Sequence, residues 1–371
     1  MKIWNEGKIK NFADVKGGKR LPKGKQLTKE PNSHPYIRIK NLGKSKVLEL
    51  NSEYEYVDDE TYKSIARYTV DSGDILISVV GTIGLIAIVG ESLDKANQTE
   101  NCDKIVNIKD LDRDYLYYYL TSSIGQEEIR KGIVGAVQPK LPLKNVQDIT
   151  VKYPTLKMQK KIVSILNIID KKFFVNDEIN RNLSEQLKVI FSKMFPTIAD
   201  NGSNTLEEII SFSNGKKRPD TEGKVPVYGG NGILSYTDKS NAENCVIIGR
   251  VGAYCGSLYL SIEPCWISDN AIKAEAKNSK SQMFIYYLLQ ELALSNRHIG
   301  TSQPLLTQGI LNAIPFTCPS EEGIISFCKK ADDIQKLIDM NTIENKRLSE
   351  LRDTLLPKLM SGELDVSDLN I

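Results

Sequence analysis

GAVQPKL at residues 135–141 and GTSQPLL at residues 300–306 are two copies of one pattern, Gly-x-x-Gln-Pro. Each copy is followed by a short apolar run, a proline and then a long segment of mixed polar and apolar residues. The two glutamines, Gln138 and Gln303, are 165 residues apart. Self-similarity at a fixed distance is the sequence signature of an internal repeat, so these stretches predict that one structural unit is present twice.

Three further pairs of segments repeat in the same order along the chain. They are GKRLP (18–22) with GKKRP (215–219), ILISVVG (75–81) with VIIGRVG (246–252), and LYYYL (116–120) with FIYYLL (284–289). The distance between matched segments falls from 197 to 165 residues, so the first copy is the longer one. Its extra residues lie mainly between 22 and 80, where the segment 47–70 has no counterpart. The predicted fold is therefore an α/β (α+β) tandem duplication.

Each copy is predicted to be one globular domain followed by one long helix. Short strands with glycine-rich turns, one amphipathic helix (115–132 or 282–296) and a closing strand make up each domain. Thr155 and Ser320 are N-cap residue types directly after a proline, and Pro196 and Gly362 are residue types that end helices. These signals set the predicted boundaries: domains at 1–154 and 197–319, helices at 155–196 and 320–361, and a tail at 362–371.

The two predicted helices are long enough to form a coiled coil. At a rise of 1.5 Å per residue, each is roughly 60 Å long. Apolar residues recur at heptad spacing, with Ile179, Leu337 and Leu351 among them. A second apolar set lies outside this seam and is interpreted as a docking face for the domains or for another protein: Phe173, Phe174, Phe191, Met194 and Leu356. The alternative is that each helix packs only on its own domain.

Composition and charge are those of an ordinary globular protein. The chain has 371 residues and a net charge of +2. Its longest apolar run, 75–90, is interrupted by Gly81 and Gly84 and is short for a membrane span. This run is predicted to form two buried strands joined by a glycine turn. The N-terminus lacks the apolar core of a signal peptide, which predicts a cytoplasmic protein with no membrane contact.

The residue types that catalysis or metal binding requires are scarce. The six cysteines show no Cys-x-x-Cys spacing and only two histidines are present, so we expect reduced, packed thiols and no metal site. The sequence contains no Gly-x4-Gly-Lys-Ser/Thr loop for a nucleotide. It also lacks the Asn/Asp-Pro-Pro-aromatic signature of amino-methylating enzymes. These features favour a protein that binds without catalysing a reaction.

Two matched basic clusters predict a polyanionic partner. Residues 16–25 carry five cations and no acid, and residues 216–218 are all basic. One such cluster alone is usually a solvated surface. Because both occupy the same position in the repeat, we interpret them as contacts to phosphate groups of a polyanionic partner. The predicted phosphate contacts are Lys19, Arg20 and Lys23 in the first domain, and Lys216, Lys217 and Arg218 in the second.

In this order, several motifs together resemble one known family. They are GKRLPKG (18–24), PYIRIKNL (35–42), GDILISVVGTIG (73–84), VPVYGGNGI (225–233), IIGRVGAYCG (247–256), WISDNAI (266–272) and LPKLMSGEL (356–364). The chain resembles the specificity subunits of type I restriction–modification systems over essentially its whole length. The resemblance implies two target recognition domains, each reading one half of a bipartite, asymmetric site in double-stranded DNA. It also implies an antiparallel coiled coil that sets the spacer between the half-sites, with pseudo-two-fold symmetry.

The resemblance further implies which partners carry the chemistry. The specificity subunit is not an enzyme and holds no cofactor of its own. It docks two methyltransferase subunits that use S-adenosylmethionine, and restriction subunits that use ATP and Mg²⁺ complete the nuclease. A free-standing duplicated DNA-binding or protein-interaction scaffold is the alternative, as is an enzyme acting on nucleic acid. The first would not explain the paired basic loops, and the second lacks a catalytic set.

Candidate base readers are the polar side chains of the loops, because Arg, Asn, Gln and hydroxyl groups reach base edges. In the first domain they are Arg38, Lys40, Asn41, Ser78 and Thr82; in the second they are Tyr228, Asn231, Arg250 and Tyr254. Arg250 is the strongest candidate, with a structural ion pair to Asp269 or Glu243 as its alternative. Gln138 and Gln303 are candidate DNA contacts or simply parts of a turn.

Two asparagines are predicted to set the register of the coil. Asn176 and Asn341 are equivalent in the repeat, fall on the apolar seam and lie near the middle of their helices. A buried asparagine pair costs stability unless both members are matched. We therefore expect the two side chains to meet amide to amide.

Overall fold

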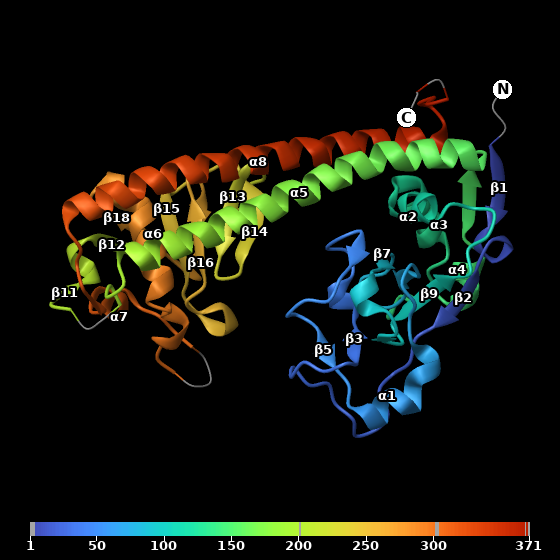
Figure 1. Ribbon diagram of the computed structural model, residues 1–371, viewed down its shortest axis with the longest axis horizontal. Helices are drawn as coiled ribbons and strands as arrows, with labels where there is room; N and C mark the ends of the chain where they lie inside the picture. Colours follow the sequence, from blue (N-terminus) through green and yellow to red (C-terminus); the bar gives the residue numbers. More distant parts are fainter. Residues whose placement is uncertain (1–3, 200–201, 301–303, 368, 370–371) are drawn as a thin grey trace. The chain divides into compact units, whose positions relative to one another are not determined.

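The structure, a computed structural model, describes residues 4–199, 202–300, 304–367 and 369. The chain divides into two compact units, one formed by Met1–Phe174 with Asn345–Ile371 and the other by Val175–Glu344. Each unit holds one globular domain and part of both long helices (Figure 1), which are α5 (Leu156–Met194) and α8 (Glu321–Ser361). Helix α5 begins directly after Thr155, and α8 ends before Gly362, which has a φ of +78°.

The domain of the first unit is built on a five-stranded sheet of order β2-β9-β6-β7-β4, a three-stranded sheet of order β5-β3-β8, and the pair β1-β10. The strands are β1 (Asn5–Lys8), β2 (Asp14–Gly17), β3 (Pro35–Ile37), β4 (Val47–Leu48), β5 (Glu55–Tyr56), β6 (Ile75–Ser78), β7 (Ile86–Val89), β8 (Asn97–Gln98), β9 (Cys102–Val106) and β10 (Thr150–Tyr153). The apolar run 75–90 forms β6 and β7, which are antiparallel and fully buried. Gly81 and Gly84 in their turn have φ of +74° and +89°, so the prediction of two buried strands joined by a glycine turn is confirmed.

The helices of this domain differ from the prediction at one point. They are α1 (Asp59–Ile65), α2 (Arg113–Thr121), α3 (Ser123–Lys131) and α4 (Leu143–Gln147). The single helix predicted at 115–132 is wrong, because Ser122 is extended and separates α2 from α3. Its hydroxyl accepts a hydrogen bond from the Gly125 amide at 3.1 Å and caps α3. A Cβ at Gly125 would lie 2.0 Å from the Tyr119 carbonyl oxygen, so this close turn requires glycine.

The domain of the second unit repeats the same plan with fewer strands. Its sheets have the orders β12-β18-β15-β16, β14-β13-β17 and β11-β19. The elements are β11 (Asn204–Thr205), β12 (Ile210–Asn214), β13 (Val225–Gly229), β14 (Gly232–Thr237), β15 (Cys245–Gly249), β16 (Leu258–Ser261), β17 (Trp266–Ile267), β18 (Ala271–Ala276), α6 (Gln282–Glu291), α7 (Gln308–Asn312) and β19 (Pro315–Phe316). The order β12-β18-β15-β16 repeats β2-β9-β6-β7, and β4 of the first domain adds a fifth strand. Because β4 and α1 come from residues 47–70, the longer first copy is confirmed.

Each domain packs on the beginning of one long helix and the end of the other. The core of the first unit includes Ile162 from α5 and Leu356 from α8, and the core of the second includes Phe327 from α8 and Phe191 from α5. These residues are equivalent in the repeat at a distance of 165. The second apolar set was interpreted as a docking face either for the domains or for another protein. Three of its members pack on the domains: Leu356, Phe191 and the partly buried Met194. Phe173 and Phe174, by contrast, are exposed by 41% and 60%.

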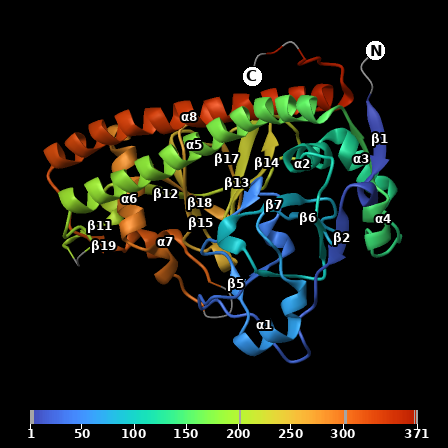
Figure 2. The same cartoon turned by 45° about the vertical axis from the view of Figure 1, so that its right-hand side comes forward.

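Within each unit, segments of α5 and α8 run antiparallel to one another (Figures 1 and 2). In the first unit the Arg352 guanidinium lies 3.7 Å from the Asp170 carboxylate, and the Lys161 ammonium donates to the Ser367 carbonyl at 2.5 Å. In the second unit the helices meet through side-chain amides near Asn180.

The prediction of a strict heptad seam is wrong in part. Ile179, Leu337 and Leu351 are exposed by 41%, 50% and 47%, because much of each helix face is used to bury a domain. The predicted contact between Asn176 and Asn341 is also wrong. The Asn341 amide donates to the Asn180 oxygen at 2.8 Å, one turn further along α5, and the Asn176 amide donates to Glu344 at 2.7 Å.

Candidate nucleic-acid interface

The two basic loops begin at glycines in equivalent tight contacts. A Cβ at Gly18 would lie 2.1 Å from the carbonyl oxygen of Thr99, and one at Gly215 would lie 2.0 Å from that of Ser268. Any other residue would collide with the backbone there. The glycine thus lets the basic loop of each domain lie directly against a second loop, formed by residues 99–101 or 268–270.

The lysine after each glycine extends this contact. The Lys19 amide donates to the Gln98 carbonyl at 3.1 Å, and the Lys216 amide donates to the Ile267 carbonyl at 2.9 Å. With their backbones held, the side chains are free to face solvent. All six predicted phosphate contacts are exposed: Lys19, Arg20, Lys23, Lys216, Lys217 and Arg218.

The end of the central strand lies beside the same second loop. The amide of Val79, directly after β6 and Ser78, donates to the Asn101 carbonyl at 2.8 Å. In the second domain the amide of Arg250, directly after β15, donates to the Asn270 carbonyl at 3.0 Å. Val79 and Arg250 are therefore equivalent, and only the second domain places a cation at this position.

The Gly-x-x-Gln-Pro loop completes the arrangement. The Leu141 amide donates to the Val79 carbonyl and the Leu306 amide to the Arg250 carbonyl, both at 2.9 Å. Val134 pairs with Lys140 and Ile299 pairs with Leu305, and the glycine of each loop has positive φ, +93° at 135 and +85° at 300. Gln138 is exposed in its loop, and Gln303 lies outside the described residues. In each domain, four loops far apart in sequence thus meet at one edge of the central sheet.

Two predicted base readers of the first domain serve the fold instead. Asn41 is 6% exposed, and its oxygen accepts the Arg38 amide at 2.8 Å. Ser78 is fully buried; its hydroxyl donates to the Thr82 carbonyl at 2.6 Å and accepts from the Leu85 amide at 2.8 Å. Both side chains shape turns, which corrects their assignment as readers. Thr82 itself is exposed in the β6–β7 turn.

Two other predicted readers, Arg38 and Lys40, share one carboxylate. Arg38 Nη1 and Lys40 Nζ each lie 2.6 Å from Glu55 Oε2. The hydrogen bond from Lys40 is the main reason that the pKa of Glu55 is lowered, so this carboxylate stays charged at neutral pH. Both cations remain about half exposed, at 46% and 50%.

In the second domain the structure separates the predicted readers. The Tyr228 ring packs against a small apolar cluster that contains Cys245 and Ile267, and burial raises its pKa. Tyr228 is half-buried, and its assignment as a reader stays a prediction. Asn231 and Tyr254 are exposed. A Cβ at Gly230 would lie 3.7 Å from that of Tyr254 and 3.5 Å from the Gly249 Cα, so the turn at 230–231 meets the Arg250 loop.

Arg250 has unusual surroundings for a charged residue. Its Nε is buried, and among the described residues it has no hydrogen-bond partner. Within the same part of the chain, Arg250 forms no ion pair with Asp269 or Glu243, the partners that a structural role would require. A buried guanidinium donor without a partner carries a desolvation cost that an acceptor on a ligand would offset.

Sequence reasoning missed the loop that organises the edge. Thr99-Glu100-Asn101 and Ser268-Asp269-Asn270 are 169 residues apart and share a hydroxyl, an acid and an asparagine. Both asparagine carbonyls hold the strand-end residue, as described above, and the Asn270 side chain is exposed. The repeated pattern was present in the sequence, but only the backbone contacts show that it joins the basic loop to the strand end.

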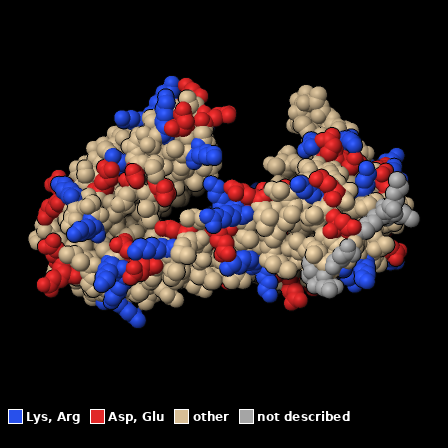
Figure 3. Space-filling view, turned by 90° about the horizontal axis from the view of Figure 1, so that it is seen from above, with Lys and Arg blue, Asp and Glu red and all other residues tan. Residues whose placement is uncertain are grey.

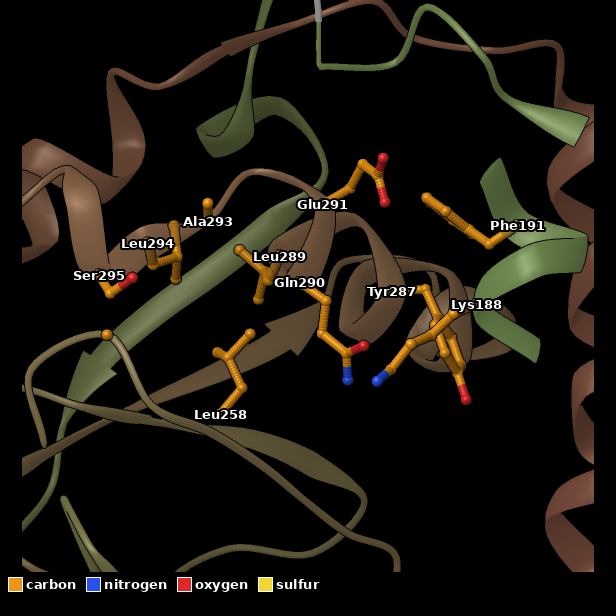
Figure 4. A pocket seen from close by; sticks show the side chains of 11 residues that line it. Lys188, Phe191, Leu258, Tyr287, Leu289, Gln290, Glu291, Ala293, Leu294 and Ser295 are labelled. Carbon is orange, nitrogen blue, oxygen red and sulfur yellow. The ribbon is translucent and has the colours of Figure 1, made fainter. Parts of the chain in front are cut away.

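Other surfaces of the described residues show fewer features of a binding or catalytic site. A pocket of about 510 Å³ in the second unit is lined by residues of α5, α6 and the β16 region, among them Lys188, Leu258, Gln290 and Glu291 (Figure 4). Its described lining has no cysteine or histidine, so it presents neither a thiol nucleophile nor an imidazole. Across the described chain, no three metal-ligating side chains gather into a site. On the face seen in Figure 3, basic and acidic side chains are interspersed, with no broad region of one sign.

Comparison with known proteins identifies the class. A family model described as "Type I restriction modification DNA specificity domain" matches residues 1–188 and 200–353. The specificity subunit of the type I restriction enzyme MjaIX from Methanocaldococcus jannaschii is 22% identical over 420 aligned residues, covering 99% of this chain and 95% of that protein. The specificity subunit of HindI from Haemophilus influenzae is 43% identical over 65 residues, covering 18% of this chain and 14% of that protein.

A solved structure shares the fold. The S subunit of the type I restriction–modification system of M. genitalium has a TM-score of 0.54 at 21% identity, covering 96% of both chains. The chain belongs to the type I restriction–modification DNA specificity family. Its function in such a system is DNA specificity, and it is a non-catalytic subunit. None of the described helices is both long and apolar enough to span a membrane.

Proposed function

We propose that each domain of this specificity subunit reads one half of a bipartite, asymmetric site in double-stranded DNA. The observation that supports this is the set of equivalent backbone contacts that brings the four loops together in both domains, with exposed Lys and Arg beside the end of the central strand. Cations there supply phosphate contacts, and the polar side chains between them are placed to reach base edges. Because the loops differ in sequence between the copies, the two half-sites differ.

We further propose that the helices set the spacer and dock two methyltransferase subunits. Apolar side chains such as Phe174 in the first unit and Met340 in the second are exposed by 60% and 65%, and exposed apolar surface is typical of interaction sites. The duplication of the domain-and-helix unit supports two copies of one partner. The methyltransferases bind S-adenosylmethionine, restriction subunits bind ATP and Mg²⁺, and the whole complex acts on DNA in the cytoplasm.

The test is an exchange of one domain. Residues 8–154 are replaced by the corresponding domain of another specificity subunit, and the hybrid is assembled with its methyltransferase. Mapping of methylated sites across a genome should show one half-site changed, with the other half and the spacer retained. If both half-sites change together, the domains do not read DNA independently.

A free-standing scaffold is the competing function, and assembly separates the two. The chain alone and the chain mixed with its methyltransferase are compared for binding to the mapped site. Selective binding that requires the mixture supports a specificity subunit. Equal selectivity of the isolated chain supports the free-standing protein.

A further inference from the structure

The basic edge of the first domain is held by carboxylates of the same domain. Glu55 bonds both Arg38 and Lys40 at 2.6 Å, and Glu100 bonds Arg20 at 2.7 Å. The Glu55 side chain is only 17% exposed, less than either of the cations that it binds. It is therefore the most enclosed member of a fixed three-residue cluster.

The fold fixes the Glu55 cluster through its backbone. Glu55 lies on β5 and pairs with Tyr36 on β3, and Arg38 follows directly after β3. The Arg38 amide is bonded by the Asn41 side chain at 2.8 Å. Next to it, the Ile37 carbonyl accepts the Thr99 amide at 3.0 Å, which joins the cluster to the four-loop edge.

The second domain lacks this arrangement. Within the described residues, none of Lys216, Lys217 and Arg218 has a carboxylate within 4.0 Å, and in the equivalent loop of the first domain Arg20 is paired with Glu100 whereas Lys19 and Lys23 are not paired. The unpaired side chains are ready to bind phosphate, and each phosphate contact adds about 0.9 to the slope of log affinity against log salt. Arg38 and Lys40 already have a carboxylate that competes with phosphate. The paired cations of the Glu55 cluster thus differ electrostatically from the unpaired lysines of the basic loops.

We propose that Glu55 determines specificity at the first half-site. It keeps Arg38 and Lys40 from binding DNA phosphates independently of sequence. It also orients Arg38 so that its remaining donors face a base edge. Glu55 is a positioning residue, since it acts through the two cations. This inference rests on the proposed function, and it concerns discrimination at the first half-site.

The test compares Glu55→Gln with Glu53→Gln in the complex with the methyltransferase. Glu53 is a matched control, because it is two residues away, pairs with Lys44 at 2.5 Å and is 59% exposed. Both variants change the net charge equally. Glu55→Gln should bind duplexes of random sequence more tightly, steepen the salt slope by about 0.9 to 1.8 as one or two cations are freed, and lose selectivity at the first half-site. Glu55→Asp should retain selectivity, and Glu53→Gln should leave it unchanged.

Three outcomes overturn the inference: equal effects of the two glutamine variants, weaker binding of random DNA by Glu55→Gln, or unchanged selectivity. If Glu55→Gln fails to fold, Lys40→Gln and Lys217→Gln answer the same question. Lys40→Gln should leave the salt slope unchanged and Lys217→Gln should lower it by about one; equal reductions overturn the inference. A wild-type complex without any sequence preference would contradict the proposed function itself, which the random-sequence measurements do not depend on.

Discussion

Asn341 donates its side-chain amide to the Asn180 oxygen at 2.8 Å, so one asparagine pair joins α8 to α5 in the second unit. Both residues are half-buried. The Asn180 amide also approaches the Ile338 carbonyl at 3.3 Å and the Thr342 hydroxyl at 3.4 Å. A partly buried polar cluster of this kind favours one axial register of two helices, because sliding either helix by a turn would break it.

The asparagine pair predicts a coupling between its members. Asn341→Leu should destabilise the second unit, since it leaves the Asn180 oxygen without its donor. The double variant Asn180→Leu/Asn341→Leu should recover about 0.5–1.5 kcal/mol relative to the sum of the single variants. Chemical denaturation of all four proteins gives the coupling energy, and additive effects would show that the pair does not specify register.

Helix length predicts the spacer of the DNA site. One added turn in both α5 and α8 lengthens each helix by about 5 Å, against a rise of about 3.4 Å per base pair. The lengthened protein should require a spacer longer by one or two base pairs with the same half-sites. Methylation mapping measures this, and an unchanged spacer would show that the helices do not act as a ruler.

Arg250 is predicted to read a base in the second half-site. Arg250→Ala should cost about 1–3 kcal/mol of binding and relax specificity at one position. Arg297→Ala is the control, because the Arg297 Nε bonds the Leu292 carbonyl at 2.9 Å and so has a structural role. It should lower thermal stability and leave specificity intact. If Arg250→Ala behaves in the same way, its role is structural too.

Lys46 is predicted to fix the first domain to its helices. Its ammonium bonds Asp114 at 2.8 Å and Tyr118 at 3.2 Å, and it reaches Asn167 on α5 at 2.5 Å. Lys46→Met should destabilise the unit by about 2–3 kcal/mol, whereas Lys44→Met, which removes an exposed pair, should change stability by less than about 0.5 kcal/mol.

The pH dependence of the stability lost in Lys46→Met tests the same contact in a second way. Burial acts to raise the pKa of Asp114, but the hydrogen bonds from Lys46 and Arg113 outweigh it and lower that pKa. A depressed carboxyl pKa stabilises the fold above the unfolded value, near 3.9, and this contribution disappears as the pH falls through the folded value. The difference in free energy of unfolding between wild type and Lys46→Met, measured by chemical denaturation, should therefore shrink below about pH 4. A constant difference would exclude Asp114 as its source.

The buried carboxyl group of Asp103 predicts the opposite dependence of stability on pH. It lies buried on β9, and burial raises its pKa to about 7. Between the unfolded value and about 7, the unfolded chain loses its proton first, so stability should fall with rising pH by up to about 1.4 kcal/mol per unit. Asp103→Asn should remove this slope. Denaturation between pH 5 and 7 tests it, with Asp148→Asn as a control, since hydrogen bonds from Lys10 and Lys8 lower the pKa of Asp148.

The duplication, the long helices and the buried β6–β7 pair were predictable from the sequence, because repeats, caps and apolar runs are local signals. The partner of Asn341 was not. Repeat equivalence identifies Asn176 and Asn341 as counterparts, but the axial register of two helices depends on how each packs on its domain. The roles of Asn41 and Ser78 were also hidden, since a polar side chain that caps a turn and one that reads DNA look alike in sequence. The basic loops were recognisable from charge alone, whereas the carboxylate that pairs with Arg20, Glu100, comes from a loop distant in sequence.

The first unit is built from both ends of the chain, whereas the second is one continuous segment, Val175–Glu344. Leu356, Leu359 and Met360 complete the core that residues 9–166 begin. On the ribosome, residues 9–166 are therefore made before the α8 residues that complete their core, whereas the second unit is made as one uninterrupted segment. A chain released after residue 344 would lack part of the core of its first domain, so loss of the α8 residues beyond 344 would impair a recognition surface formed by residues far earlier in the sequence.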